Sequence, residues 1–416
     1  MGYNPGQDRA VLVIEPMGAG LALVDAARDA GFYVAAVSYD ADDRRLPDRH
    51  RDRVELLVAD TNDEAAVTAA ALALHARRPL AGILPGFEFY VDAAARLAAR
   101  LGLPSLPPAT VTRARDKALM RATVEAVGLR VPRWAEAGDA AGLTAAAERV
   151  GFPAVLKPAA SAGSVHVSRV DDAAQLAEAY AWMHADPRTD LGRRLDGRVL
   201  LEEYLDGPEV SVEGLVAGGE LSPLAVTTKM LGPEPWFVEV GHVVPQDLQP
   251  AARAGIEAYV AGVGRALGLT LGVFHCELRL VRGEPVLVEI GARLPGGHIA
   301  DLVELVTGVS MPKVMLAAHT GLDPARLGAF GTPRAKYAGI AAITAGGPGQ
   351  VAALPGVDRL RGAEDVLDVQ VYVSPGEELP LPDDFRSRLG HVIFHADSYL
   401  AALERWHAIR AEVRHD

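Results

Sequence analysis

The sequence predicts a multidomain protein of mixed α/β and α+β class. Its 416 residues exceed the usual size of one domain. Short apolar strands alternate with helices over residues 11–105, and a hairpin that carries two acids follows much later, over 273–290. The first pattern is typical of a parallel sheet and the second of an antiparallel strand pair, so the chain combines both kinds of sheet.

Composition excludes several classes of protein. Half of the residues are hydrophobic and 23% are charged, as in ordinary globular proteins. The net charge of −13 argues against nucleic acid as a partner, because little would neutralise its phosphates. The sequence has no apolar run long enough for a membrane span, and residues 1–10 lack the apolar core of a signal peptide. The single Cys276 excludes a disulfide framework. We therefore expect a cytoplasmic protein.

Residues 1–110 are expected to form an N-terminal α/β domain with a parallel sheet. Ligands bind at the carboxyl ends of strands in such sheets, and Glu88 follows the third strand, which makes it a candidate substrate residue. An acid favoured at a helix N-terminus is the alternative explanation. The predicted strands are 11–15, 34–38 and 81–86, and the predicted helices are 19–30, 63–77 and 90–101.

Residues 111–208 are expected to form a helical linker and a small lid. Prolines over 104–110 mark the boundary before it, and 111–150 is predicted to be helical. In the lid, an apolar strand ends in Lys157, and small residues follow over 159–164. Such a loop lets backbone N–H groups approach phosphate oxygens while the lysine adds positive charge, although a plain hairpin turn also favours small residues.

Residues 209–330 are expected to form a central domain that carries the most informative pattern. Two strands, 273–281 and 286–290, are joined by a tight turn and carry Glu277 and Glu289. Neighbouring strands can place both carboxylates on one face, where they repel unless a proton or cation lies between them. Magnesium often takes one or two carboxylates and shares its other positions with nucleotide phosphates. An ordinary hairpin with outward acids is the alternative.

Two further segments complete the pattern. Residues 226–248 contain a Gly-Pro-Glu-Pro run that cannot form regular structure. We expect a loop over the active site with Lys229 and His242 at its ends, or else a strand histidine bonded to backbone. Residues 331–416 are expected to form a β-rich C-terminal extension that is closed by a helix near 397–412.

Five motifs and their order along the chain resemble those of the ATP-grasp superfamily of carboxylate–amine ligases. Each is weak alone, but five in order over roughly 180 residues form a specific signal. The C-terminal extension is similar to that of the L-amino acid ligase branch, which forms dipeptides. The motifs are Asp116-Lys117, Val155-Leu156-Lys157-Pro158 with its loop, Glu202-Glu203-Tyr204-Leu205, Glu277, and Glu289-Ile290-Gly291-Ala292-Arg293.

The resemblance implies an ATP-grasp fold with an N-terminal parallel-sheet domain, a small lid, a central antiparallel-sheet domain and a C-terminal β-rich extension. It also implies ATP and Mg²⁺, or Mn²⁺, as cofactors. The implied roles are ATP binding by Lys117, Lys157, Ser161, Gly163, Ser164, Glu202, Glu203, Tyr204, Leu205 and Glu209; metal binding by Glu277 and Glu289; catalysis by Arg293 and His242; and substrate binding by Glu88, Lys229, Gly296 and Gly297.

The activity that the resemblance implies is ATP-dependent amide-bond formation between two amino-acid-like substrates. A substrate carboxylate becomes an acyl phosphate, an amine attacks it, and ADP and phosphate are released. Arg293 would steady the oxyanion, and His242 would position the amine or accept its proton. We expect small-molecule amino acid, or carboxylate and amine, substrates and neither nucleic acid nor membrane as a partner. The sequence leaves a homodimer open.

Three alternatives stay open at this point. They are another ATP-grasp ligase, such as a carboxylase of the biotin carboxylase type or a purine-pathway enzyme; a γ-glutamyl ligase; and a non-catalytic ATP-binding module. Gly291 departs from the family pattern, which has an Asn there, so the number of metal ions also stays open. Gly297 suggests an open pocket wall and a substrate bulkier than alanine, or simply a turn that needs positive φ.

Overall fold

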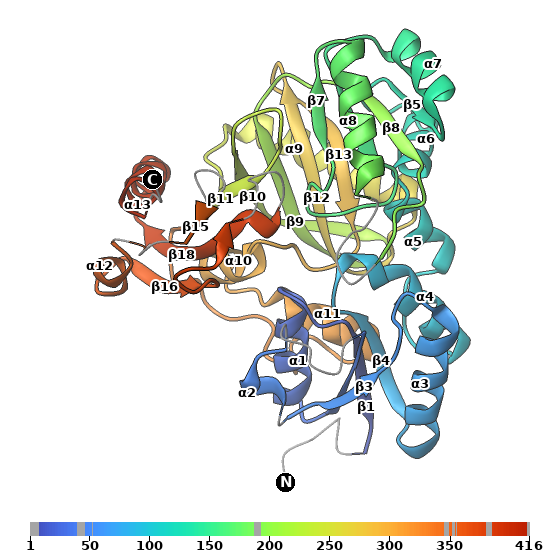
Figure 1. Cartoon of the computed structure of the whole chain (residues 1–416). Coiled ribbons are helices and arrows are strands. Elements are labelled where there is room, and N and C mark those ends of the chain that lie inside the picture. The colour runs from blue at the N-terminus through green and yellow to red at the C-terminus, as the bar shows by residue number, and fades with distance from the viewer. Residues whose placement is uncertain are drawn as a thin grey trace.

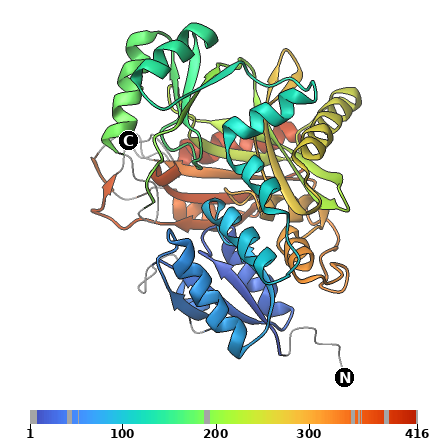
Figure 2. The same ribbon diagram turned by 90° about the vertical axis from the view of Figure 1, so that its right-hand side faces the viewer.

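The computed structural model describes residues 8–39, 46–51, 53–186, 193–344, 349–351, 354, 356–379 and 385–413. A large central sheet lies between a lid above and an N-terminal unit below, with the C-terminal unit (from residue 337 onward) at one side (Figure 1 and Figure 2). Among the described residues, no helix combines the length and the apolar character needed to cross a membrane.

The N-terminal unit (residues 10–100) is a four-stranded parallel sheet flanked by helices, as the alternation of strands and helices predicts. The strand order is β3-β2-β1-β4. The edge strand β3 was not predicted, because its four residues are partly exposed and show no buried apolar run. The elements are β1 (Ala10–Ile14), α1 (Gly20–Asp29), β2 (Tyr33–Ser38), α2 (Asp48–Arg51), β3 (Glu55–Val58), α3 (Glu64–Arg77), β4 (Leu80–Pro85), η1 (Glu88–Tyr90) and α4 (Val91–Arg100).

The lid (residues 134–203) is an antiparallel sheet of order β5-β8-β6-β7 with two helices. The prediction that 111–150 is helical throughout is wrong at Trp134–Ala137, which forms β5. Four residues are too few to show a strand period, and β5 forms because it pairs with β8. The elements here are α5 (Pro108–Arg115), α6 (Lys117–Ala126), β5, α7 (Ala140–Val150), β6 (Ala154–Pro158), β7 (Ser168–Val170), α8 (Ala173–Ala185) and β8 (Val199–Glu203).

The central sheet has eight antiparallel strands in the order β13-β12-β9-β10-β11-β14-β18-β16. Strands from before and after residue 330 therefore belong to one sheet; the domain boundaries at 110, 208 and 330 stay predictions. Its strands are β9 (Glu209–Ala217), β10 (Glu220–Leu231), β11 (Glu239–Val244), β12 (Leu271–Val281), β13 (Glu284–Gly291), β14 (Tyr337–Thr344), β16 (Val366–Val371) and β18 (Arg388–Ala396).

Apolar cores lie on both faces of the central sheet and include residues of the helices that pack there. One apolar core joins the N-terminal sheet, α1, α10, α11 and the inner face of the central sheet, so the two units pack as one body. A second core lies under α9 on the other face. The remaining elements are α9 (Pro250–Leu267), α10 (Ile299–Thr307), α11 (Met311–Thr320), β15 (Gly349–Gln350), α12 (Val357–Arg361), β17 (Glu378–Leu379), η3 (Phe385–Ser387) and α13 (Tyr399–Glu412).

Candidate active site

Two adjoining cavities lie between the lid, the central sheet and the N-terminal unit. The lid cavity has lining residues from β6, β8, the lid loop 159–167 and the central sheet. The N-terminal cavity has lining residues from the turns after β1, β4 and β13 and a volume of about 430 Å³, within the range of small-molecule sites. Both cavities are lined by Ala162, Gly163, Glu239, Glu277, Arg293, Phe385 and Arg388.

The two acids of the hairpin face each other as predicted. Glu277 on β12 and Glu289 on β13 are direct cross-strand partners, and both line the lid cavity. Glu289 Oε2 lies 2.8 Å from Lys117 Nζ, and Glu277 Oε1 lies 2.7 Å from Lys229 Nζ. The structure thus brings the predicted carboxylate pair together on one face, each acid beside an ammonium group.

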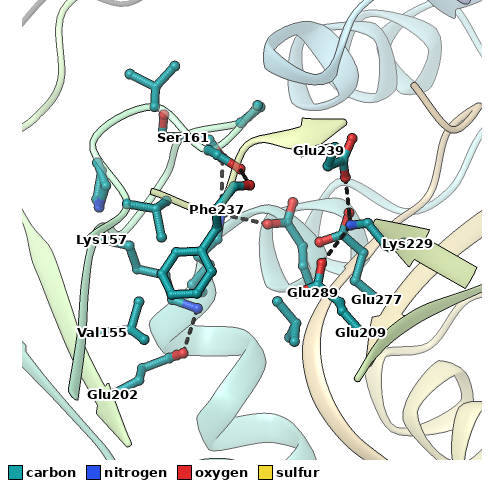
Figure 3. Close-up of a pocket in the computed structure, with 18 of the residues that line it drawn as sticks. Val155, Lys157, Ser161, Glu202, Glu209, Lys229, Phe237, Glu239, Glu277 and Glu289 are labelled. Carbon is teal, nitrogen blue, oxygen red and sulfur yellow. Dashed lines mark hydrogen bonds and ion pairs between the residues drawn. The ribbon is translucent and has the colours of Figure 1, made fainter. Parts of the chain in front are cut away.

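Lys229 lies at the centre of a buried cluster of acids (Figure 3). Its Nζ is 2.8 Å from Glu209, 2.6 Å from Glu239 and 2.7 Å from Glu277. Burial opposes the charge of Lys229, but the three carboxylates together raise its pKa well above the ordinary value. Burial likewise opposes ionisation of Glu277, whose pKa Lys229 and His275 nevertheless hold well below its usual range. Lys229 and Glu277 therefore form a charged pair at neutral pH.

Lys117 and Lys157 occupy neighbouring positions at the base of the lid. Asp116 caps α6 by accepting a hydrogen bond from Leu119 N–H at 3.0 Å, which fixes Lys117 in the first turn. Lys117 Nζ also donates to the Ser161 carbonyl at 3.0 Å, so it joins the lid loop to Glu289. Lys157 Nζ lies 2.5 Å from Glu202, and burial lowers its pKa against the pull of this acid.

Glu202, which the family resemblance implies binds ATP, is held by two buried basic side chains. The fully buried Arg121 donates to both of its oxygens, at 2.9 and 3.3 Å, and also to the Val288 carbonyl at 2.6 Å. Burial opposes ionisation of Glu202, but Arg121 and Lys157 lower its pKa. Glu202 lines the lid cavity together with Glu203, Tyr204, Leu205 and Glu209. The structure therefore brings these predicted residues together at one cavity, while their binding of ATP stays a prediction.

The lid loop presents a backbone and a hydroxyl to the lid cavity. Ser161, Gly163 and Ser164 all line it, and Gly163 has a φ of +68°, which favours glycine. The Ser161 hydroxyl is buried and has no hydrogen-bond partner among the described residues. Ser164 Oγ donates to the Phe237 carbonyl at 2.9 Å, which ties the loop to the hairpin tip between β10 and β11. A buried hydroxyl beside two lysines suits a phosphate oxygen.

Glu88 and Arg293 meet across the boundary between the N-terminal unit and the central sheet. Glu88 opens η1 and is almost fully buried, where Arg115 donates to it at 2.6 Å and Arg293 Nε forms a second ion pair. Burial alone would raise the pKa of Glu88, but Arg293 and Arg115 lower it to about 2. Gly291 explains part of this packing, because a Cβ there would lie 3.3 Å from both Arg293 and Glu88. The Asn expected by family resemblance at this position would crowd the ion pair.

His242 lies within a strand, as in the alternative that we left open, and not at the end of a loop. Lys229 and His242 lie on β10 and β11 as cross-strand partners, and only 232–238 forms the connecting loop. His242 borders a small recess beside Glu239 and Gly297, and burial lowers its pKa to about 4. A Cβ on Gly297 would lie 2.7 Å from His242 Nε2, and φ is +59° there. Gly296 lines the N-terminal cavity, and a Cβ there would meet open space.

Several residues of the site were not predicted. His275 lies between two acids, with Nδ1 2.8 Å from Glu213 and Nε2 3.1 Å from Glu277. Burial lowers its pKa, but these hydrogen bonds raise it overall to about 9. The alternation of β12 places His275 on the same face as Glu277, so this signal was present in the sequence. Phe385 and Arg388 come from the C-terminal unit, and no local pattern connects them with the site.

The residues present suit a divalent cation and a nucleotide. Two carboxylates on rigid strands are oxygen donors of the kind that magnesium prefers, and Lys117, Lys157 and the Ser161 hydroxyl suit phosphate. Among the residues that the structure describes, no group of three or more His, Cys, Asp or Glu side chains is placed to hold a metal ion. A cation here would therefore share its ligands with phosphate or water, as expected for magnesium.

Comparisons with known proteins agree with this fold. Family models match residues 24–105 as an ATP-grasp N-terminal domain, 150–301 as an ATP-grasp domain, and 341–416 as an L-amino acid ligase C-terminal domain 2. Among solved structures, an L-amino acid ligase from Bacillus licheniformis superposes with a TM-score of 0.82 at 24% identity, covering 99% of this chain and 100% of that chain. The ATP-grasp fold predicted from the sequence is thereby confirmed.

The relatives found by sequence match only part of their own length. An uncharacterized protein of Sinorhizobium fredii is 28% identical over 351 residues, covering 84% of this chain and 71% of that protein. The alanine–anticapsin ligase of Bacillus subtilis is 26% identical over 245 residues, covering 55% and 52%. Carnosine synthase 1 of Gallus gallus is 31% identical over 351 residues, covering 79% and 36%, so the chain spans about half or less of both named enzymes. On its motifs, fold and family matches, the chain belongs to the ATP-grasp superfamily and, within it, to the L-amino acid ligase branch.

Proposed function

We propose that the protein is an ATP-dependent carboxylate–amine ligase that joins two amino-acid-like substrates through an amide bond. The observation that carries the proposal is the junction of the two cavities. Glu277 and Arg293 line both the lid cavity, which has the phosphate-binding groups, and the N-terminal cavity, which has the volume of a small-molecule site. A carboxylate in one cavity can therefore lie next to a phosphoryl group in the other.

In this proposal, Lys117, Lys157 and the Ser161 hydroxyl bind the nucleotide phosphates. Glu277 and Glu289 hold the magnesium or manganese ion. Bound ATP and its cation would supply the phosphoryl group that converts a substrate carboxylate into an acyl phosphate. The volume of the lid cavity, about 150 Å³, is below that of most ligand sites, so nucleotide entry requires the lid to move away from the central sheet.

The ionised groups of the N-terminal cavity suit an amino acid. Arg293 and Arg388 offer guanidinium groups to a carboxylate or oxyanion, and Glu88 and Glu239 offer acids to an ammonium group. Arg293 lines both cavities and can stabilise negative charge on the carbonyl oxygen as the amine attacks. The names of the alanine–anticapsin ligase and carnosine synthase relatives support amino acids as the substrate class.

A phosphate-release screen over pairs of amino acids tests the proposal. With ATP and Mg²⁺, we expect phosphate and an amide product in equal amounts, and only when both substrates are present. Phosphate release that depends on bicarbonate would indicate a carboxylase instead. A product linked through a glutamate side chain would indicate a γ-glutamyl ligase, and nucleotide binding without turnover would indicate a binding module.

A further inference from the structure

A short turn of the C-terminal unit reaches the point where the two cavities meet. This turn is η3 (Phe385–Ser387), and Phe385 lines both cavities. The Phe385 N–H donates to the Gly163 carbonyl of the lid loop at 3.4 Å. Directly after the turn, Arg388 Nη2 lies 3.1 Å from the Glu239 carboxylate, and its Nε donates to the Glu239 carbonyl at 3.1 Å. The turn is thus attached to the lid at one end and to the central sheet at the other.

The Phe385 ring packs directly on the backbone of the lid loop. A Cβ placed on Gly163 would overlap the ring, with Cε1 of Phe385 only 3.0 Å away. Ser387 is fully buried, which fixes the turn behind the ring. Gly163 therefore serves two requirements, a left-handed backbone and close approach of an aromatic ring. Such contact leaves no space for water between the ring and the loop at this point.

We propose that Phe385 is a positioning residue that closes the junction of the two cavities against water while the activated carboxylate waits for the amine. This role rests on the proposed ligase function. Water is the competing nucleophile: its oxygen would attack the acyl carbon, the bond from that carbon to the phosphate oxygen would break, and phosphate and free carboxylate would leave. One ATP would be consumed without an amide bond. An apolar ring neither binds nor activates water, so its position favours the amine.

The alternative is that the ring only stabilises the lid loop. In that case, losing it lowers amide and phosphate production together and leaves their ratio at one. The decisive quantity is therefore phosphate released per amide bond, measured in one reaction. We expect a ratio near one for the wild-type protein and for Phe385→Tyr, which keeps the ring. The ratio should rise several-fold in Phe385→Ala and by a smaller factor in Phe385→Leu, which keeps an apolar but smaller side chain.

Phe330→Ala is the matched control, because Phe330 is 51% exposed and lines neither cavity. Its ratio should equal that of the wild-type protein. Thermal melting of each variant shows whether it is folded. If Phe385→Ala is unfolded, the ratio of phosphate to amide in Phe385→Leu tests the proposal instead. Reaction in water labelled with heavy oxygen locates the leak: the label should enter the recovered carboxylate, because water attacks the acyl carbon.

The outcomes separate this role from the ligase function itself. A wild-type protein that releases phosphate without any amide contradicts the proposed function. Equal phosphate and amide in the wild-type protein, together with an unchanged ratio in the folded Phe385→Ala or Phe385→Leu variant, contradicts only the role of Phe385. Label that enters phosphate rather than carboxylate also contradicts it, because ATP would then react with water directly.

Discussion

In the proposed function, nucleotide chemistry depends most directly on Glu277 and Glu289. We predict that Glu289→Gln lowers turnover by at least about 100-fold while the protein stays folded, because removing one carboxylate costs several kcal/mol of phosphate charge stabilisation through the cation. Glu284→Gln is the control, since Glu284 is exposed at the start of the same strand, β13. Phosphate release measured over a range of Mg²⁺ checks this. Near-normal turnover of Glu289→Gln at ordinary Mg²⁺ would contradict the metal assignment.

Arg293 provides a second test among single residues. We predict that Arg293→Lys loses as much activity as Arg293→Ala, about 100-fold or more. Arg293 forms an ion pair with Glu88 through Nε and donates a hydrogen bond to the Leu294 carbonyl through Nη1 at 3.0 Å. The ammonium group of a lysine cannot replace a planar guanidinium group that contacts several partners. Arg253→Lys is a control on the exposed face of α9, where the same change should have no effect. Substantial activity in Arg293→Lys would reduce Arg293 to a general source of positive charge.

The sequence predicted a contact between two site residues only where the residues are close together in the chain. Glu277 and Glu289 lie in one hairpin, so strand pairing alone brings them together. Lys117 and Lys157 were found by motif, but their ion pairs were not. The pair of Lys117 with Glu289 depends on the packing of α6 against the central sheet, and the pair of Lys157 with Glu202 depends on the pairing of β6 with β8 inside the lid. The pairing of Glu88 with Arg293 joins two units and has no sequence signature.

At the level of secondary-structure elements, periodicity predicted long segments well and short ones poorly. The two strands of the hairpin β12–β13 were predicted to within two residues at each end, because their pattern extends over many residues. The strand β18 (Arg388–Ala396) was missed, since Gly390 and two histidines interrupt its apolar run even though it lies inside the sheet. The β10–β11 loop was predicted to be irregular, and Glu234 at its tip contacts Arg169 and Tyr204 of the lid side.

The loop between β13 and α10 controls how much room the N-terminal cavity offers. Gly297 was the predicted wall residue, but its positive φ and its contact with His242 make any side chain there strained. Gly296 has neither restriction and lines the same cavity. We predict that Gly296→Leu lowers kcat/KM for a substrate with a large side chain about tenfold or more relative to a small one, because the new side chain fills cavity space.

Gly255→Leu is the control for Gly296→Leu. Gly255 is exposed on α9, and a Cβ there also meets open space, so this variant adds the same side chain without touching the cavity. The ratio of kcat/KM for large and small substrates, measured in both variants, checks the prediction. If the ratio does not move toward the small substrate in Gly296→Leu alone, the loop does not set the size of the substrate.

For the whole molecule, the site exists only because four stretches of chain assemble around one sheet. The lid supplies the groups that we propose bind phosphate, and the central strands supply the carboxylates. The N-terminal unit supplies Glu88, and the C-terminal unit supplies Phe385 and Arg388. Local pattern predicts each stretch but not the eight-stranded sheet that continues through β14, β18 and β16. That continuity comes from pairing between strands that are far apart in the sequence. The ATP-grasp resemblance predicted a central antiparallel sheet and a β-rich extension, but not that they share one sheet.

The packing of α11 between the N-terminal sheet and the central sheet should make global stability depend on pH. His319 on α11 is buried against β4, and its Nδ1 has no hydrogen-bond partner among the described residues. Burial lowers its pKa from 6.5 to about 4. The unfolded chain therefore binds a proton between these values and the folded chain does not, so stability falls as pH decreases through this window, by roughly 1.4 kcal/mol per pH unit for this histidine.

We predict that His319→Gln makes the melting temperature less dependent on pH between 6.5 and about 4. His242 and His391, whose pKa values burial also lowers to about 4, keep part of the dependence in the variant. His407→Gln is the control, because His407 is exposed on α13 and should leave the slope unchanged. Thermal melts at half-unit pH intervals compare the three proteins. A slope in His319→Gln as steep as that of the wild-type protein would show that the imidazole is reached by protons in the folded state, and that α11 is packed less tightly on β4 than the structure places it.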